Sequence, residues 1–230
     1  MGLFADGKYD EAAPLFQRLG DYQQAATYAA YSQGLVLWEQ ERYAEAESLF
    51  AQCRDFMYGD SRYRYCHAWA LLEAGDAQTA AASLEGMDEF ENAALLRHYC
   101  AARYAESIND YENALYEYED AKEYSDASSR LENLRIQVYL YAIELKQGGS
   151  YQQAMELFNA LGEYLSSPAY ARECKDYYRD QDYAEAERLE AAGDLRGAYE
   201  AFKGLTGYND AETRAADIAA ALGISEETTD

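Results

Sequence analysis

Residues 7–16 read GKYDEAAPLF, and closely similar stretches follow as ERYAEAESLF (41–50), NDYENALYEY (109–118) and GSYQQAMELF (149–158). The first two of these copies start 34 residues apart, and the next regular position falls another 34 residues on. A fixed period of this length is the sequence signature of a repeat protein, in which each unit stacks on its neighbours. The internal repeat therefore decides the fold, and we call a set of equivalent residues in successive repeats a column.

Four columns keep the period of 34 residues over the first 124 residues, and agreement among four columns is not a coincidence. Two further units follow at longer spacing. The columns are Tyr9, Tyr43, Ala77, Tyr111; Ala12, Ala46, Ala80, Ala114; Phe16, Phe50, Leu84, Tyr118; and Tyr22, Phe56, Phe90, Tyr124, continued by Tyr151, Ala154, Phe158, Tyr164 and by Leu195, Ala198, Phe202, Tyr208. These residues are expected to form the core.

The spacings within each unit predict two helices. A column of Tyr is followed after three residues by a small residue, and in most units after six by Leu, which places all three on one face of a helix. Tyr, Ala and Phe at i, i+3 and i+7 do the same for a second helix. A Gly between the two allows a left-handed helix end, for which Asn109 is a tolerable substitute and Glu41 a poorer one. The Tyr column is Tyr31, Tyr65, Tyr99, Tyr139 and Tyr183.

A 34-residue helix–turn–helix unit with this residue pattern resembles the tetratricopeptide repeat over about residues 5 to 220. The clearest match is Ala68, Leu71, Gly75, Ala80 and Leu84. The Trp of the family's first helix and the Pro at its unit end are missing, which makes this a divergent, Tyr-rich variant. The resemblance implies an all-α fold, a right-handed solenoid (α-α superhelix) of stacked antiparallel helical hairpins.

The period lengthens twice, by six residues before Tyr139 and by ten before Tyr183, and each insertion is expected to lengthen a first helix or add a loop. Ser167–Pro168 looks like a helix cap followed by Pro at the first helical position. We expect one repeat domain over residues 1–230. It divides into regular repeats (1–122), repeats with lengthened first helices (123–192), a last hairpin with a capping helix (193–222) and a tail (223–230).

Charge and composition limit the partners. The chain has 19 Lys and Arg against 43 Asp and Glu, a formal net charge of −24. A field of this sign repels phosphates, so nucleic acid and anionic membranes are disfavoured and a basic protein or peptide is favoured. Solubility of an elongated surface explains the same charge. Without a signal or transmembrane pattern, a cytoplasmic location is favoured.

The residues that carry chemistry do not form a recognisable enzyme or metal motif. The four cysteines have no zinc-type spacing and are expected to be buried, reduced thiols. His67 and His98 lack partner motifs, so structural or solvated roles are expected. Asp180, Asp182 and Glu185 do not fit a calcium loop and are expected to form a solvated acidic face. The sequence therefore predicts no catalytic residue, no metal and no cofactor.

One stripe on the first helices is the candidate binding surface. If the resemblance holds, these helices line a concave groove, and positions i, i+4 and i+7 from the column Tyr are apolar in the first two units and mixed or charged afterwards. An apolar groove with acidic walls suits a peptide or helix with basic flanks, while packing between helices explains the same residues. The candidate residues are Tyr31, Leu35, Trp38, Tyr65, Trp69 and Leu72.

These observations predict a non-catalytic protein- or peptide-binding scaffold or adaptor. Two alternatives stay open: a structural spacer in a larger protein, or a peptide-sensing regulatory module whose output domain is not visible in this sequence. An excess of Tyr outside the columns favours an interface, because exposed Tyr offers a large contact area at a low entropy cost. Ten of the 24 Tyr lie outside the columns, at positions 28, 58, 63, 104, 116, 141, 170, 177, 178 and 199.

Overall fold

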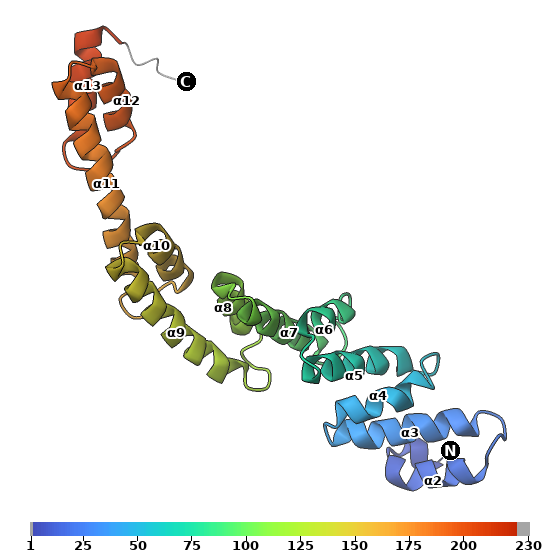
Figure 1. The fold of residues 1–230 in the computed structure, drawn as a ribbon. Helices are drawn as coiled ribbons and strands as arrows, with labels where there is room; N and C mark the ends of the chain where they lie inside the picture. Colours follow the sequence, from blue (N-terminus) through green and yellow to red (C-terminus); the bar gives the residue numbers. More distant parts are fainter. Residues whose placement is uncertain (1, 225–230) are drawn as a thin grey trace. The chain divides into compact units, whose positions relative to one another are not determined.

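A computed structural model describes residues 2–224, and in that range the chain forms thirteen α-helices and no β-strand (Figure 1). Successive helices are joined by short turns and pair side by side, which confirms the all-α, helical-hairpin repeat. The helices are α1 (Gly2–Ala5), α2 (Tyr9–Arg18), α3 (Ala25–Glu39), α4 (Tyr43–Ala51), α5 (Gly59–Glu73), α6 (Ala77–Ser83), α7 (Ala93–Ser107), α8 (Tyr111–Asp120), α9 (Ala127–Gln147), α10 (Tyr151–Ala160), α11 (Ser167–Ala191), α12 (Leu195–Lys203) and α13 (Ala211–Leu222).

The second helix of every hairpin begins at the first column residue, as the repeat predicts. Two residues before this start, the backbone is left-handed in all six hairpins. The residue there is Gly in four hairpins, and it is Glu41 (φ 57°) and Asn109 (φ 59°) in the other two. The N–H of the residue after the left-handed one donates to a carbonyl in the last turn of the first helix. For example, the Arg42 N–H donates to the Leu37 carbonyl over 2.9 Å. This six-to-one hydrogen bond satisfies a carbonyl that the helix itself leaves without a partner.

The two insertions lengthen helices and do not add loops. The first helices α3, α5 and α7 have 15 residues, whereas α9 has 21 and α11 has 25. The predicted cap of α11 was wrong by one residue, because Ser166 is the N-cap and Ser167 is already helical and fully buried. No helix among residues 2–224 combines the length and the apolar character that crossing a bilayer would require.

The chain forms two compact units, one reaching to Leu134 and the other starting at Arg135. The boundary falls inside α9, the first of the two lengthened helices. In unit 1 each helix from α1 to α8 packs against the next, and in unit 2 α10 to α13 do the same. The last helix, α13, has no second helix after it in the described part of the chain. The predicted tail lies outside the described residues from position 225 onward.

The contact between a small residue and a ring recurs at the centre of the hairpins. In the α3–α4 hairpin Phe50 is fully buried, and a Cβ built on Gly34 would stand only 2.8 Å from its ring. In the last hairpin Ala186 and Phe202 are buried in one core cluster. Full burial of such a ring stabilises the fold by about 1.5–3 kcal/mol. The small column thus lets the two helices of a hairpin close over the ring.

All four cysteines are free and buried, as predicted. Burial raises the pKa of the Cys53 thiol to about 11 and that of the Cys174 thiol above its ordinary value. Burial likewise raises the pKa of Cys66 and of Cys100 to about 12 in each case. Because the thiolate is the reactive form, these side chains serve as small apolar core residues at neutral pH.

Candidate functional site

The six residues of the predicted stripe lie on α3 and α5, within unit 1. Four of them are buried, and the two tryptophans, Trp38 and Trp69, are partly exposed. The buried members are Tyr31, Leu35, Tyr65 and Leu72. Any ligand that contacts this stripe can therefore reach it only through the tryptophan side chains and the residues beside them.

Trp38 is largely engaged in packing between hairpins. Its ring centroid lies 4.9 Å from that of Tyr65 on α5, 5.0 Å from Tyr43 on α4 and 6.0 Å from Phe90 in the loop before α7. The guanidinium carbon of Arg62 stands 4.6 Å from the ring centroid. Trp38 therefore connects two successive hairpins, α3–α4 and α5–α6, and is surrounded by aromatic rings and a guanidinium group.

Arg62 is an unusual cation because it lies inside this aromatic packing. Its Nη2 atom is 3.6 Å from Oε1 of Glu91, while Nε and Nη1 are buried and have no hydrogen-bond partner among the described residues. The face of Trp38 supplies part of the missing stabilisation through a cation–π contact. Arg62 thus places a positive charge between an aromatic ring and a carboxylate in a strongly acidic chain.

Trp69 is partly exposed and packs on two tyrosine rings. Its Nε1 donates to the Tyr124 hydroxyl over 3.2 Å, and the same hydroxyl lies 2.8 Å from that of Tyr65. On the other side Trp69 stacks with Tyr43, at 5.7 Å between centroids and 23° between planes. Since the indole N–H has its partner, the accessible part of Trp69 is aromatic surface.

Acidic side chains lie near this aromatic pair, which we define as Tyr43 and Trp69. Burial, followed by the nearby Tyr65, Glu41 and Glu91, raises the pKa of Tyr43 to about 12. Both glutamates are exposed, and Tyr43 and Trp69 are each partly exposed. A ring face beside carboxylates attracts cations, because the quadrupole of the ring and the charge of the carboxylates act in the same direction.

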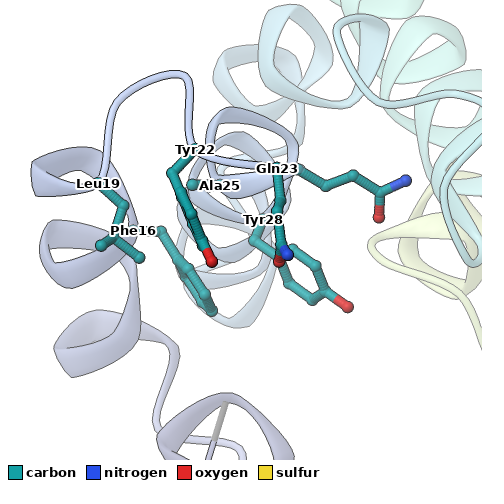
Figure 2. A pocket seen from close by; sticks show the side chains of 7 residues that line it. Phe16, Leu19, Tyr22, Gln23, Ala25 and Tyr28 are labelled. Carbon is teal, nitrogen blue, oxygen red and sulfur yellow. The ribbon is translucent and has the colours of Figure 1, made fainter.

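The sequence analysis missed a second exposed region, a cleft between the end of α2 and the start of α3. Figure 2 shows Phe16 and Leu19 on one side of it and Tyr28 on the other, with Tyr22 between them. The cleft has a volume of about 450 Å³. Tyr22 belongs to a column that was expected to be core, yet it is 64% exposed, so that expectation was wrong for this residue.

Of the ten tyrosines outside the columns, four are exposed, while Tyr199 is buried and the other five are partly buried. Non-column Tyr is therefore not a uniform surface feature of this fold. The exposed four are Tyr58, Tyr116, Tyr141 and Tyr177.

The polar residues singled out in the sequence have local structural partners. Nδ1 of His67 on α5 lies 2.7 Å from Glu47 on α4, and Nδ1 of His98 on α7 lies 2.7 Å from Glu117 on α8. These pairs join neighbouring helices. Within residues 2–224, no group of three or more His, Cys, Asp or Glu is arranged to hold a metal ion.

The predicted acidic face on α11 is exposed, and two of its three carboxylates have partners. Asp180 accepts a hydrogen bond from the Tyr208 hydroxyl, and Glu185 pairs with Arg188 one turn further along the helix. Asp182 is exposed as well.

Comparison with known proteins adds no further constraint, since no protein-family model, no curated protein and no solved structure matches this chain.

Proposed function

We propose that this protein is a non-catalytic, tetratricopeptide-like scaffold that binds proteins or peptides, and that it contacts them through the aromatic pair Tyr43 and Trp69. The observation that supports this proposal is the partly exposed stack of the two rings beside Glu41 and Glu91. Stacked rings with carboxylates around them suit an Arg or Lys side chain, or an aromatic one followed by a basic residue.

The charge of the chain supports the same class of partner. A net charge of −24 attracts a basic segment and speeds the encounter with it. Added salt screens this attraction. We therefore expect affinity for basic peptides to fall with ionic strength. A contribution from the aromatic pair should persist at high salt, because stacking is not screened in this way.

The experiment is a binding titration of the full chain against an array of 15-residue peptides graded in Arg and Lys content. Trp38 and Trp69 are the only tryptophans in the sequence, so their fluorescence reports on this region. The repeat itself suggests variants that keep the fold. Leu35 occupies the position equivalent to Trp69, and Leu195 that equivalent to Tyr43, so Trp69→Leu and Tyr43→Leu place a tolerated residue at each site.

We expect each variant to weaken the best peptide at least tenfold while circular dichroism stays unchanged. The matched control is Tyr151→Leu, the same column position in unit 2, which should leave affinity unaltered. Peptide affinity that is the same in all four proteins would refute the aromatic pair as the contact. Absence of binding by every peptide would favour the alternative of a structural spacer.

A further inference from the structure

A groove lies between α2, α3 and α4 within unit 1, and it shares no lining residue with the cleft of Figure 2. Its volume is about 460 Å³. Part of its lining is apolar and comes from all three helices: Ala13 and Pro14 of α2, Val36 and Leu37 of α3, and Leu49 of α4. Pro14 is exposed and the residues from α3 and α4 are partly exposed, so a ligand can reach this lining.

One period later, the chain fills the equivalent place with its own side chains. The positions equivalent to Ala13 and Gln33, which both line the groove, carry an acid and an imidazole. They are Glu47 on α4 and His67 on α5. Nδ1 of His67 lies 2.7 Å from Oε1 of Glu47, so a polar bridge joins the two helices there. Between α2 and α3 no such bridge can form, because Ala13 has no polar side chain.

The three aliphatic side chains of the lining are also particular to this groove. The positions of Val36, Leu37 and Leu49 recur twice in unit 1. One period later they hold Ala70, Leu71 and Ser83, and two periods later Tyr104, Ala105 and Glu117. The same helical arrangement forms with all three sets, so the packing of the repeat does not require three aliphatic side chains at these positions.

Polar groups at the edge of the groove are free to bind a ligand. Among residues 2–224, the side chains of Asp10, Gln17 and Gln33, which line the groove, have no hydrogen bond or ion pair. Pro14 lies inside α2 and has no N–H, so it cannot donate to the Asp10 carbonyl four residues earlier. Asp10 therefore offers both a carboxylate and a main-chain carbonyl as acceptors near the start of α2.

We propose that this groove binds an extended segment of a partner protein that carries an aliphatic side chain and, close to it, an Arg or Lys. The aliphatic side chain packs on Val36, Leu37 and Leu49, and the cation pairs with Asp10. An extended segment suits the two glutamine amides of the groove, because its backbone N–H and C=O groups are free to bond with them. In a helix these groups are already paired with each other.

Charge favours a basic occupant over a second copy of this chain. The Asp10 carboxylate has no basic partner among the described residues, and the net charge of −24 attracts a cationic segment. Two copies of the chain carry the same net charge and repel each other. The proposal goes beyond the aromatic pair, because neither Tyr43 nor Trp69 lines this groove.

The probe is a set of fluorescein-labelled nine-residue peptides made of Gly and Ser, with Leu at the centre and Arg one, two or three positions after it. Fluorescence anisotropy with the full chain should show saturable binding for at least one spacing. Replacing the peptide's Leu by Ser should weaken the best peptide about tenfold, because the aliphatic contact is lost. Replacing its Arg by Gln should weaken binding about three- to fivefold, as expected for an exposed ion pair.

Two variants of the chain test the groove directly. Asp10→Asn, at an exposed position, should abolish the preference for the Arg peptide over the Gln peptide. Ala13→Glu combined with Gln33→His installs the bridge of the next repeat and should weaken the best peptide about tenfold, because it fills the groove. The repeat accepts both residues one period later, so the double variant is expected to fold, which circular dichroism checks.

The matched control is the reverse exchange, Glu47→Ala with His67→Gln, which should leave the affinity for the best peptide unchanged. Trp69→Leu should also have no effect, which separates this groove from the aromatic pair. Absence of saturable binding by every peptide, or equal affinity in the wild type and the Ala13→Glu, Gln33→His variant, would overturn the proposal. Binding lost only in Trp69→Leu would overturn it in favour of the aromatic pair.

Discussion

Tyr65 on α5 and Tyr183 on α11 occupy the same column, yet their surroundings differ in kind. Tyr65 is buried among the rings of Trp38, Tyr43 and Phe90. Tyr183 is only partly buried; besides packing on Phe202 and Tyr208, it donates to Asp210 and accepts from Arg214. The repeat therefore sets where the tyrosine stands, whereas the neighbouring side chains decide whether it is held mainly by apolar packing or by polar bonds.

The polar surroundings of Tyr183 centre on one cation. Nη1 of Arg214 on α13 donates to Glu187 over 2.7 Å, and Nη2 pairs with Glu190, both on α11. Arg214 also lies over the ring of Phe202 at 4.6 Å. Unit 2 thus fastens its last helix with charge, at the position where unit 1 has Arg62 inside an aromatic cluster. Stability in the two units should respond differently to mutation and to salt.

The largest expected effect is that of removing the buried ring. Tyr65→Ala should cost about 3–5 kcal/mol of local stability, because a core aromatic residue leaves a cavity when it is truncated. Tyr183→Ala should cost much less, because that side chain is partly exposed. Hydrogen exchange followed by mass spectrometry measures both, through the protection of α5 and α11. Equal losses of protection in α5 and α11 would contradict the difference between the two units.

Salt should act mainly on unit 2. Arg214→Met keeps the side-chain length but removes the ion pairs with Glu187 and Glu190, and should cost about 1–2 kcal/mol at low ionic strength. The stability difference between this variant and the wild type should shrink at about 0.5 M salt, because the Debye length is then only a few ångströms and the ion pairs are screened. The readout is the hydrogen-exchange protection of α13. The control is Arg188→Met, which removes an exposed ion pair with Glu185 within α11. A loss independent of salt would argue for packing on Phe202 instead.

A smaller effect is expected from Gly34→Ala in unit 1. The new methyl group would meet the Phe50 ring at 2.8 Å. Overpacking typically costs about 1–3 kcal/mol, and the higher helix propensity of Ala returns about 1 kcal/mol. The net loss should be about 1 kcal/mol in the protection of α3 and α4. The neighbouring change Gln33→Ala serves as a control, and greater stability of Gly34→Ala would show that Phe50 moves freely.

The smallest change should be a gain. Glu41 adopts a left-handed backbone at a turn where four equivalent hairpins have Gly. Glu41→Gly should therefore stabilise the α3–α4 hairpin by about 0.5–1 kcal/mol, and the reverse change Gly75→Glu should weaken the next hairpin by a similar amount. Thermal unfolding and hydrogen exchange record both. Destabilisation by Glu41→Gly would mean that the entropy of the added Gly outweighs the relief of strain.

Much of the fold could be predicted from the sequence because it depends on spacing. The starts of α2 and α4, the left-handed turn at Glu41 and the lengthening of α9 and α11 all follow from column positions and helical periodicity. The predicted N-cap of α11 failed because two serines precede Pro168, and either can occupy the position before the helix.

The burial of side chains could not be predicted in the same way. Tyr22 and Phe56 occupy equivalent positions in one column. The exposure of each side chain depends on whether a helix packs across it, which is a property of the neighbouring segment. For the same reason the stripe contains four buried residues and two partly exposed ones. The period shows which face a residue occupies, and the extent of the adjoining helix determines what covers that face.

The buried thiols offer a way to follow the two units separately. Cys53, Cys66 and Cys100 lie in unit 1, and Cys174 is the thiol of unit 2. A buried thiol reacts with an alkylating reagent only when its surroundings open, so the labelling rate of each cysteine measures the opening of its own hairpin. The native chain therefore carries four probes of local opening, and the order in which the cysteines are labelled would show in which hairpin unfolding begins.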